Sequence, residues 1–182
     1  MDVELVLRAQ HGDEEAFASL AVAVGARLHA VSHRILRDID LAEDATQQAL
    51  LSIWRDLPLL RDPAKFDAWS YRLLVRACYA EGRRTRVWAP NLRLLPASEP
   101  STPEGLSEVV DRDQLERGFR RLSIDHRAVV VLHHYLDLPL EAVAETLGVP
   151  LGTVRSRLHY AMRGLRAALE ADARPAAREV AQ

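Results

Sequence analysis

Apolar residues recur every three or four positions along most of this chain, a spacing that predicts amphipathic helices and not strands. The clearest stripe follows Gly12-Asp13, where an aspartate can cap the N-terminus of a helix by accepting hydrogen bonds from free backbone N–H groups. Its members are Phe17, Leu20, Val24, Leu28, Val31 and Ile35. A weaker helical pattern covers residues 2–10. No alternation of apolar and polar residues is long enough for a strand.

Two more helices are predicted in the first half of the chain, before residue 87. Asp40 with Glu43 forms a variant of the capping box, which predicts the start of a helix there. Its apolar face comprises Ala45, Ala49, Ile53 and Leu57. Asp62-Pro63 places a proline at the first position of the next helix, which we expect to end near Gly82. The predicted buried stripe of that helix comprises Phe66, Trp69, Leu73, Ala77 and Ala80.

The helical pattern stops between two blocks of the chain. Residues 87–112 hold Pro90, Pro96, Pro100 and Pro103, and no apolar stripe runs through their proline-rich part. A loop of this length is uncommon inside one compact domain, so we interpret the segment as a linker. The sequence therefore predicts an all-α chain of two small helical domains. The predicted ranges are 1–86 for the first domain, 87–112 for the linker, 113–172 for the second domain and 173–182 for a tail.

The second block contains a segment with the pattern of a helix-turn-helix, residues 140–166. Gly148 permits a tight turn, and Val154 and Leu158 can anchor the second helix on the first. That arrangement leaves a polar and basic set on the other faces, as a DNA recognition helix requires. The set is Thr153, Arg155, Ser156, Arg157, His159, Tyr160 and Arg163. The alternative is an ordinary helical hairpin with a solvated basic face.

Charge is distributed unevenly. The net charge is -2, which taken alone argues against a nucleic-acid-binding protein. Yet residues 72–86 hold five arginines against one acid, and residues 146–169 hold four arginines and no acid. Two local basic segments are compatible with two phosphate-binding surfaces. Two solvated helix faces are the alternative interpretation.

Composition excludes several classes of protein. With 48% hydrophobic and 27% charged residues, the chain is a globular protein, and it lacks any stretch of ~18 apolar residues that would insert into a membrane. Cys78 is the single cysteine, and no secretory signal opens the sequence, which fits a cytoplasmic protein. His126, His133 and His134 fall on different helical faces, so we expect no metal site. Neither a cofactor motif nor a catalytic set is present, so we expect no enzyme activity.

In the order and spacing of its motifs, the chain resembles an extracytoplasmic-function (group IV) sigma factor of the sigma-70 family. The opening LVLRAQHGDEEAFASL is similar to the start of sigma domain 2, and DLAEDATQQALLSIWRDL is similar to its polymerase-binding helix. FDAWSYRLL resembles the following helix, and the segment from RLSIDHRAVVVLHHYLDLPL through GTVRSRLHYAMRGLR resembles sigma domain 4. The resemblance implies a promoter-specificity subunit that binds core RNA polymerase and promoter DNA and assists strand opening. It also implies an anti-sigma partner.

The resemblance assigns residues to three surfaces. The core-polymerase-binding set is Glu43, Asp44, Gln47, Gln48 and Trp54. The set facing the -10 promoter element is Lys65, Arg72, Arg76, Arg83, Arg84 and Arg86. The set facing the -35 element is Thr153, Arg155, Ser156, Arg157, His159 and Arg163. The family usually has Asn at the position of Arg76 and Asp near Ala80, so we expect the -10 surface here to depend more on charge than on base identity.

Two other function classes remain as alternatives. A helix-turn-helix regulator that binds DNA alone requires a dimer helix or sensor domain, and the N-terminal block resembles neither. A helical protein-interaction adaptor leaves the basic face of residues 153–166 unexplained.

Overall fold

The computed structural model describes the backbone of residues 1–88 and 106–179, and the side chains of residues 1–84 and 114–170. Within those ranges it contains helices and turns and no strand, which confirms the all-α prediction. The N-terminal unit comprises α1 (Val3–Gln10), α2 (Glu14–Leu36), α3 (Ile39–Asp56) and α4 (Phe66–Trp88), with short 3-10 turns η1 (Leu57–Leu59) and η2 (Pro63–Lys65). None of the described helices is long and apolar enough to span a membrane.

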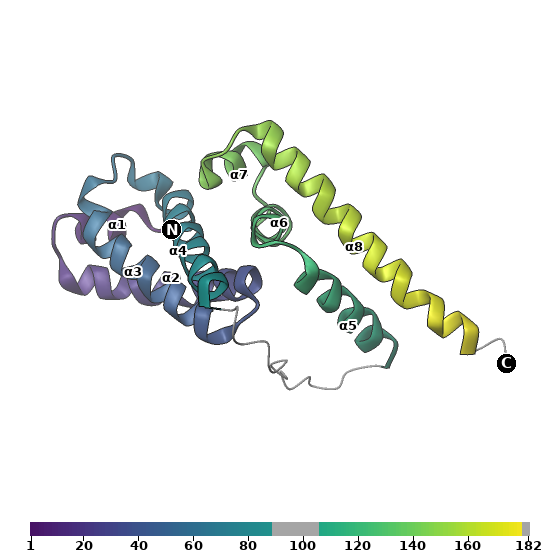
Figure 1. The fold of residues 1–182 in the computed structure, drawn as a ribbon. Helices are drawn as coiled ribbons and strands as arrows, with labels where there is room; N and C mark the ends of the chain where they lie inside the picture. The colour runs from purple at the N-terminus through teal and green to yellow at the C-terminus, as the bar shows by residue number, and fades with distance from the viewer. Residues whose placement is uncertain (89–105, 180–182) are drawn as a thin grey trace.

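The C-terminal unit comprises α5 (Leu106–Arg121), α6 (Ile124–Val130), a π-helical turn η3 (Val131–Tyr135), α7 (Leu140–Leu147) and α8 (Leu151–Glu179). Figure 1 shows α8 as a long helix with α5 lying alongside it and α7 at its N-terminal end. Helix α5 begins before residue 113, where we expected the domain to start, and α8 continues past residue 172 into the predicted tail. Most of the predicted linker, residues 89–105, lies outside the described residues.

The core of the N-terminal unit follows the α2 stripe predicted from the sequence. Leu20, Val24, Leu28, Val31 and Ile35 are all fully buried. The predicted cap is also confirmed, because the Asp13 carboxylate accepts a hydrogen bond from the backbone N–H of Ala16 at 2.9 Å. The cap of α3 was predicted wrongly. Asp38, in an extended conformation, accepts from the N–H of Leu41 at 2.9 Å, whereas Asp40 already lies in the first helical turn.

Phe66 is buried as predicted, but the rest of α4 is buried on a different face from the one predicted. Its fully or nearly buried apolar residues are Phe66, Tyr71, Leu74, Val75 and Cys78. Trp69, Leu73 and Ala77 of the predicted stripe pack only at the edge of this core. Gly82 does not end the helix, which continues to Trp88. A Cβ atom at Gly82 would lie 2.8 Å from Ile124 Cδ1, so this glycine permits α4 and α6 to approach closely.

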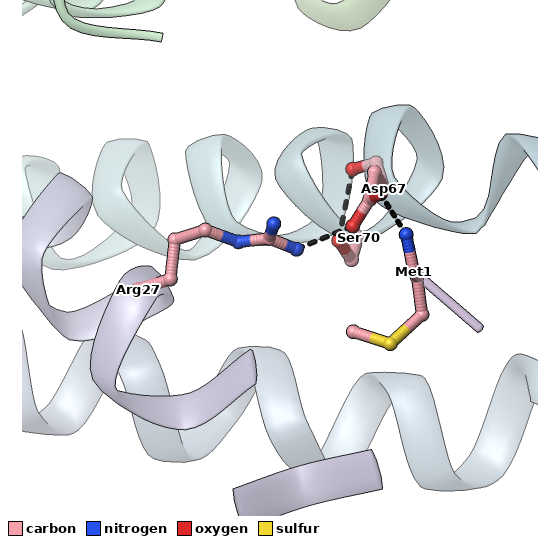
Figure 2. A network of polar contacts seen from close by, with 4 residues as sticks. All are labelled: Met1, Arg27, Asp67 and Ser70. Atoms are coloured by element: carbon pink, nitrogen blue, oxygen red, sulfur yellow. Dashed lines mark hydrogen bonds and ion pairs between the residues drawn. The ribbon is translucent and has the colours of Figure 1, made fainter. Parts of the chain in front are cut away.

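A polar network joins the first turn of α4 to the chain before it (Figure 2). The Asp67 carboxylate forms an ion pair with Arg27 of α2 and a second one with the amino group of Met1, at 3.0 Å. Ser70 donates to the Asp67 carbonyl at 2.9 Å, inside the same turn. These contacts join the first turn of α4 to α2 and to the N-terminus of the chain.

The helix-turn-helix is built by local backbone chemistry. Ser123 caps α6, because its hydroxyl accepts a hydrogen bond from the backbone N–H of His126 at 3.3 Å. Gly148 ends α7 with φ of 66°, in the left-handed region that glycine adopts without a steric penalty. Val154 is fully buried behind the turn, and Leu158 packs partly against the same core. The two helices are thereby held with the outer face of α8 exposed.

The two units are packed together in this structure. One continuous hydrophobic core contains residues of α2, α3 and α4 together with Val129, Leu132, Val143 and Val154 of the C-terminal unit. Around it, Arg37 forms an ion pair with Glu116, and the Arg34 guanidinium lies 3.8 Å from the centre of the Tyr135 ring. The sequence predicted two units but gave no indication of this contact between them.

We expect Gly148→Ala to lower the free energy of unfolding by about 1–2 kcal/mol, because an alanine at positive φ brings its Cβ against the backbone. Nothing lies within 4 Å of the added Cβ, so the loss isolates the backbone conformation. Urea denaturation followed by circular dichroism measures it.

Gly25→Ala is the matched control, since its added Cβ also meets nothing within 4 Å but its backbone is helical. We expect this change to raise stability by roughly 0.5–1 kcal/mol through helix propensity. A stability loss of equal size at both positions would contradict the assigned turn geometry.

Candidate polymerase and DNA interfaces

Helix α3 presents an exposed seam of mixed polarity. All four polar members of the predicted polymerase set, Glu43, Asp44, Gln47 and Gln48, are exposed. Asp44, Gln47, Leu51 and Trp54 follow one another at intervals of three and four residues, so they lie along one side of the helix. We call these four residues the α3 seam.

The α3 seam contains two large apolar side chains that its own unit does not bury. Leu51 is 59% exposed and Trp54 is 49% exposed. The Trp54 and Phe17 rings meet edge to face, with a centroid distance of 4.5 Å and an interplanar angle of 72°. Acidic, amide and apolar side chains at this spacing fit the surface of another helix with basic flanks. Sequence reasoning missed Leu51, although its position off the buried stripe was a usable signal.

Helix α4 carries a second surface, made of basic residues. Arg72, Arg76 and Arg83 are spaced by four and seven residues and so share one side of the helix, with Lys65 just before it. Lys65, Arg76 and Arg83 are exposed to solvent. We call these four residues the α4 basic face. A row of this kind can follow a nucleic-acid backbone.

The other two members of the predicted -10 set are not placed on the α4 basic face. Arg84 turns toward Glu81, one turn earlier, and donates to both of its carboxylate oxygens at 3.0 Å. Glu81 is itself buried, so Arg84 compensates its charge. The Arg86 side chain lies outside the described residues.

Helix α8 carries the third surface. Arg155, His159 and Arg163 lie at intervals of four residues and line one open groove together with apolar Leu158 and Met162 and with Leu140 of α7. Thr153 and Ser156 lie near the N-terminus of α8, where Ser156 donates to the Thr153 carbonyl at 2.9 Å. We call Arg155, His159 and Arg163 the α8 basic face.

Arg157 departs from the other predicted -35 residues. Its side chain is only 24% exposed and forms an ion pair with Asp125 of α6 at 3.1 Å. Arg72 of the α4 basic face is also engaged, since its guanidinium donates to the Glu145 carbonyl of α7 at 2.9 Å. Arg72 therefore contacts the other unit, whereas Arg157 is paired within its own unit.

His133 makes a structural contact within the C-terminal unit. His133 lies with Nδ1 2.8 Å from the Leu138 carbonyl, which stabilises the turn after η3. Within the described part of the chain, no group of three histidine, cysteine or acidic side chains is placed to hold a metal ion. Cys78 lies on the buried side of α4, and burial raises the pKa of its thiol to about 12.

Comparison with known proteins identifies the two units. Residues 20–87 match the family described as Sigma-70 region 2, and residues 118–167 match Sigma-70 region 4. The α3 seam and the α4 basic face lie in the first match. The α8 basic face lies in the second.

Three relatives illustrate the similarity. The ECF RNA polymerase sigma factor SigL of Mycobacterium tuberculosis is 33% identical over 142 residues, which cover 75% of this chain and 79% of that protein. The ECF RNA polymerase sigma-E factor of Escherichia coli is 30% identical over 176 residues, covering 90% and 92%. The fold is similar to that of the sigma factor RpoE, solved with the anti-sigma factor NepR from Bartonella quintana, with a TM-score of 0.68 and 23% identity over 85% of this chain and 96% of that one. This chain belongs to the extracytoplasmic-function sigma factors of the sigma-70 family, and it is an RNA polymerase sigma factor that acts in promoter recognition and transcription initiation.

Proposed function

We propose that the three surfaces divide the work of a sigma factor between the two units. The α3 seam binds core RNA polymerase, the α4 basic face contacts the -10 element, and the α8 basic face contacts the -35 element. The observation that carries the proposal is the separation of these surfaces: the acidic and apolar seam lies on one helix, and each basic face lies on another. The proposed domains are residues 1–86 and 113–172, joined by a linker.

The chemistry of each surface fits its proposed role. At the -35 element, arginines near the start of a recognition helix can donate to guanine O6 and N7 in the major groove. At the -10 element, strand separation leaves single-stranded DNA, which a row of cations holds through its phosphates. Extruding a base from the duplex costs a few kcal/mol, so the -10 contacts must offset that cost.

Neither basic face is large enough to bind DNA tightly alone. The net charge of -2 adds a weak overall repulsion between the chain and DNA. Core polymerase, by holding both units at a fixed separation, would make the second contact effectively intramolecular. We propose that the chain supplies promoter specificity in this way in the cytoplasm, whereas RNA synthesis belongs to the polymerase.

An anti-sigma protein is a further proposed partner. The sigma factor RpoE of similar fold was solved in complex with an anti-sigma factor. In this chain the exposed apolar residues of the α3 seam offer a surface that such a partner could cover, in direct competition with core polymerase.

Reversal of one charge tests the seam. We expect Asp44→Arg to weaken binding to core polymerase at least tenfold, because an exposed acid facing a basic helix is replaced by a like charge. Fluorescence anisotropy with labelled protein and purified core polymerase measures the affinity. Glu15→Arg makes the same change of charge on α2 and should leave the affinity within about twofold. Equal losses for the two variants would contradict the proposed contact.

Removal of an apolar side chain tests the same surface without changing charge. We expect Leu51→Ala to reduce affinity for core polymerase roughly tenfold, the order expected when a leucine buried on binding is lost. The side chain is 59% exposed in the free protein, so its thermal unfolding midpoint should shift little. A variant with lower stability and unchanged affinity would show that Leu51 belongs to the core of the protein and not to the seam.

In vitro transcription tests the DNA surfaces and the function together. With core polymerase and a pool of promoter fragments, the chain should produce transcripts that share two upstream elements. Arg155→Ala and Arg163→Ala should each lower -35-dependent transcription about tenfold, the loss expected for one arginine contact to a base or phosphate.

Affinity for core polymerase should not change in either variant. Arg121→Ala removes an exposed arginine of α5 and is the control. Absence of transcripts together with tight DNA binding by the chain alone would favour the stand-alone regulator instead.

A further inference from the structure

The chain between α3 and α4, residues 57–65, is anchored at both ends and exposed between them. Leu57 at its start is buried in the core of the N-terminal unit, and Phe66, directly after its end, is fully buried. Between these anchors the Leu59 side chain is 78% exposed, and Arg61 and Lys65 are exposed as well. We call residues 57–65 the α3–α4 connection. It holds an apolar side chain and two cations on the surface of the protein.

Gln10, the last residue of α1, reaches the α3–α4 connection from a distant part of the chain. Its Nε2 atom donates to the Leu57 carbonyl at 3.0 Å and to the Leu60 carbonyl at 2.7 Å. A glutamine amide has two N–H donors, and these two bonds use both of them. The two acceptors lie on either side of Leu59, and the N–H of Leu60 donates back to the Leu57 carbonyl at 3.0 Å. Gln10 therefore fastens to α1 the turn that carries Leu59.

The backbone of this turn needs an outside donor. The turn is a single 3-10 unit, and Pro58 within it has no N–H group, so it lacks the repeated hydrogen bonds of a longer helix. A partly buried carbonyl without a donor costs free energy. If the amide of Gln10 were replaced by a group that cannot donate, the carbonyls of Leu57 and Leu60 would lose this partner, and the turn would have to move to reach water.

None of the three surfaces proposed above includes Gln10 or Leu59. Helix α1 also precedes the residues that match Sigma-70 region 2, which begin at residue 20. Yet α1 packs against both short turns of the α3–α4 connection, η1 and η2. The position of α1 therefore gives it a means of acting on the surface that follows the connection.

The exposed groups of the α3–α4 connection match the chemistry of separated DNA. Lys65 ends the connection and belongs to the α4 basic face, so it can hold a phosphate. Leu59 can pack on the face of a base, as apolar side chains do where bases are unstacked. In duplex DNA stacking covers the base faces, so a contact of this kind forms only after the strands separate. The connection thus carries a group for the backbone and a group for the bases.

We propose that Gln10 is a positioning residue for the -10 contact: from α1 it holds the α3–α4 connection in the conformation that presents Leu59 to the bases of separated DNA, beside the phosphate-binding cations of the α4 basic face. This rests on the proposed role of the α4 basic face at the -10 element. Gln10 itself does not touch DNA in this arrangement.

Two DNA fragments test the proposal with the complex of this chain and core polymerase. One fragment is a forked promoter whose -10 element is unpaired, and the other is a duplex that holds the -35 element alone; both are taken from a promoter recovered by in vitro transcription. Gln10→Glu keeps the shape of the side chain but removes its donors. It should weaken binding to the forked fragment roughly five- to tenfold and leave binding to the -35 duplex within about twofold. A variant that merely lowered the amount of folded protein would weaken both alike, so the ratio of the two affinities reports positioning.

Two variants of α1 serve as controls. Gln10→Lys replaces the amide by another donor and should keep the ratio of affinities within about twofold of the parent. Arg8→Ala removes the 2.6 Å ion pair with Asp13 at the same end of α1, a pair that does not involve the α3–α4 connection. It should also keep the ratio within about twofold. A change of ratio in Arg8→Ala as large as that in Gln10→Glu would mean that the integrity of α1, and not the amide of Gln10, matters.

A double variant tests whether Gln10 acts through Leu59. Leu59→Ala should weaken binding to the forked fragment roughly fivefold, through loss of its apolar contact. Adding Gln10→Glu to Leu59→Ala should then cost less than Gln10→Glu costs alone, because the two residues serve one contact. Fully additive losses would refute the link between them, and an unchanged ratio in Gln10→Glu would refute the positioning role itself.

Arg76→Ala separates failure of this inference from failure of the proposed function. Arg76 is an exposed member of the α4 basic face and is not part of the α3–α4 connection. Unchanged binding of Arg76→Ala to the forked fragment would count against the α4 basic face as the -10 contact. Weaker binding of Arg76→Ala with an unchanged ratio in Gln10→Glu would leave the -10 contact in place and reject the role of Gln10.

Discussion

The structure depends on helix α4, because this one helix packs against α2 and α3 on one side and against α6 and α7 on the other. One side buries Phe66, Leu74 and Cys78 against α2 and α3, and this burial holds the N-terminal unit together. The other carries arginines and contacts α6 and α7. At Arg72, the side of α4 that belongs to DNA in the proposed function is contacted by the C-terminal unit in this structure. Lys65, Arg76 and Arg83 of the same face stay exposed.

The strengths of the contacts at that surface are unequal. The Arg72 side chain is 35% exposed and that of Glu145 is 66% exposed, so their ion pair contributes at most about 1 kcal/mol. The buried valines and leucines shared by both units contribute more, because their burial does not depend on charge or salt. In this arrangement apolar contacts hold the units together, whereas the ion pairs determine which arginines are covered.

The near-zero net charge follows from the same division of surfaces. Acids gather near the start of α2 and along α3, and arginines on α4 and α8, so attraction to DNA is local. Two weak, separated contacts suit a specificity subunit, because their combined affinity depends on the polymerase that holds them at the correct distance. A strongly basic chain would bind DNA everywhere without polymerase.

The sequence by itself determined the features that depend on neighbours along the chain: the α2 stripe, the caps at Asp13 and Ser123, and the turn at Gly148. Helical periodicity and capping are local, so a single sequence is sufficient to predict them. Only the tertiary structure decided which face of α4 is buried, because apolar residues occur on two of its sides and the choice depends on the helices packed against it. It also decided that Gly82 makes space for Ile124, that Leu51 stays exposed, and that Arg157 turns toward Asp125. Each of these depends on residues distant in sequence, which local patterns cannot supply.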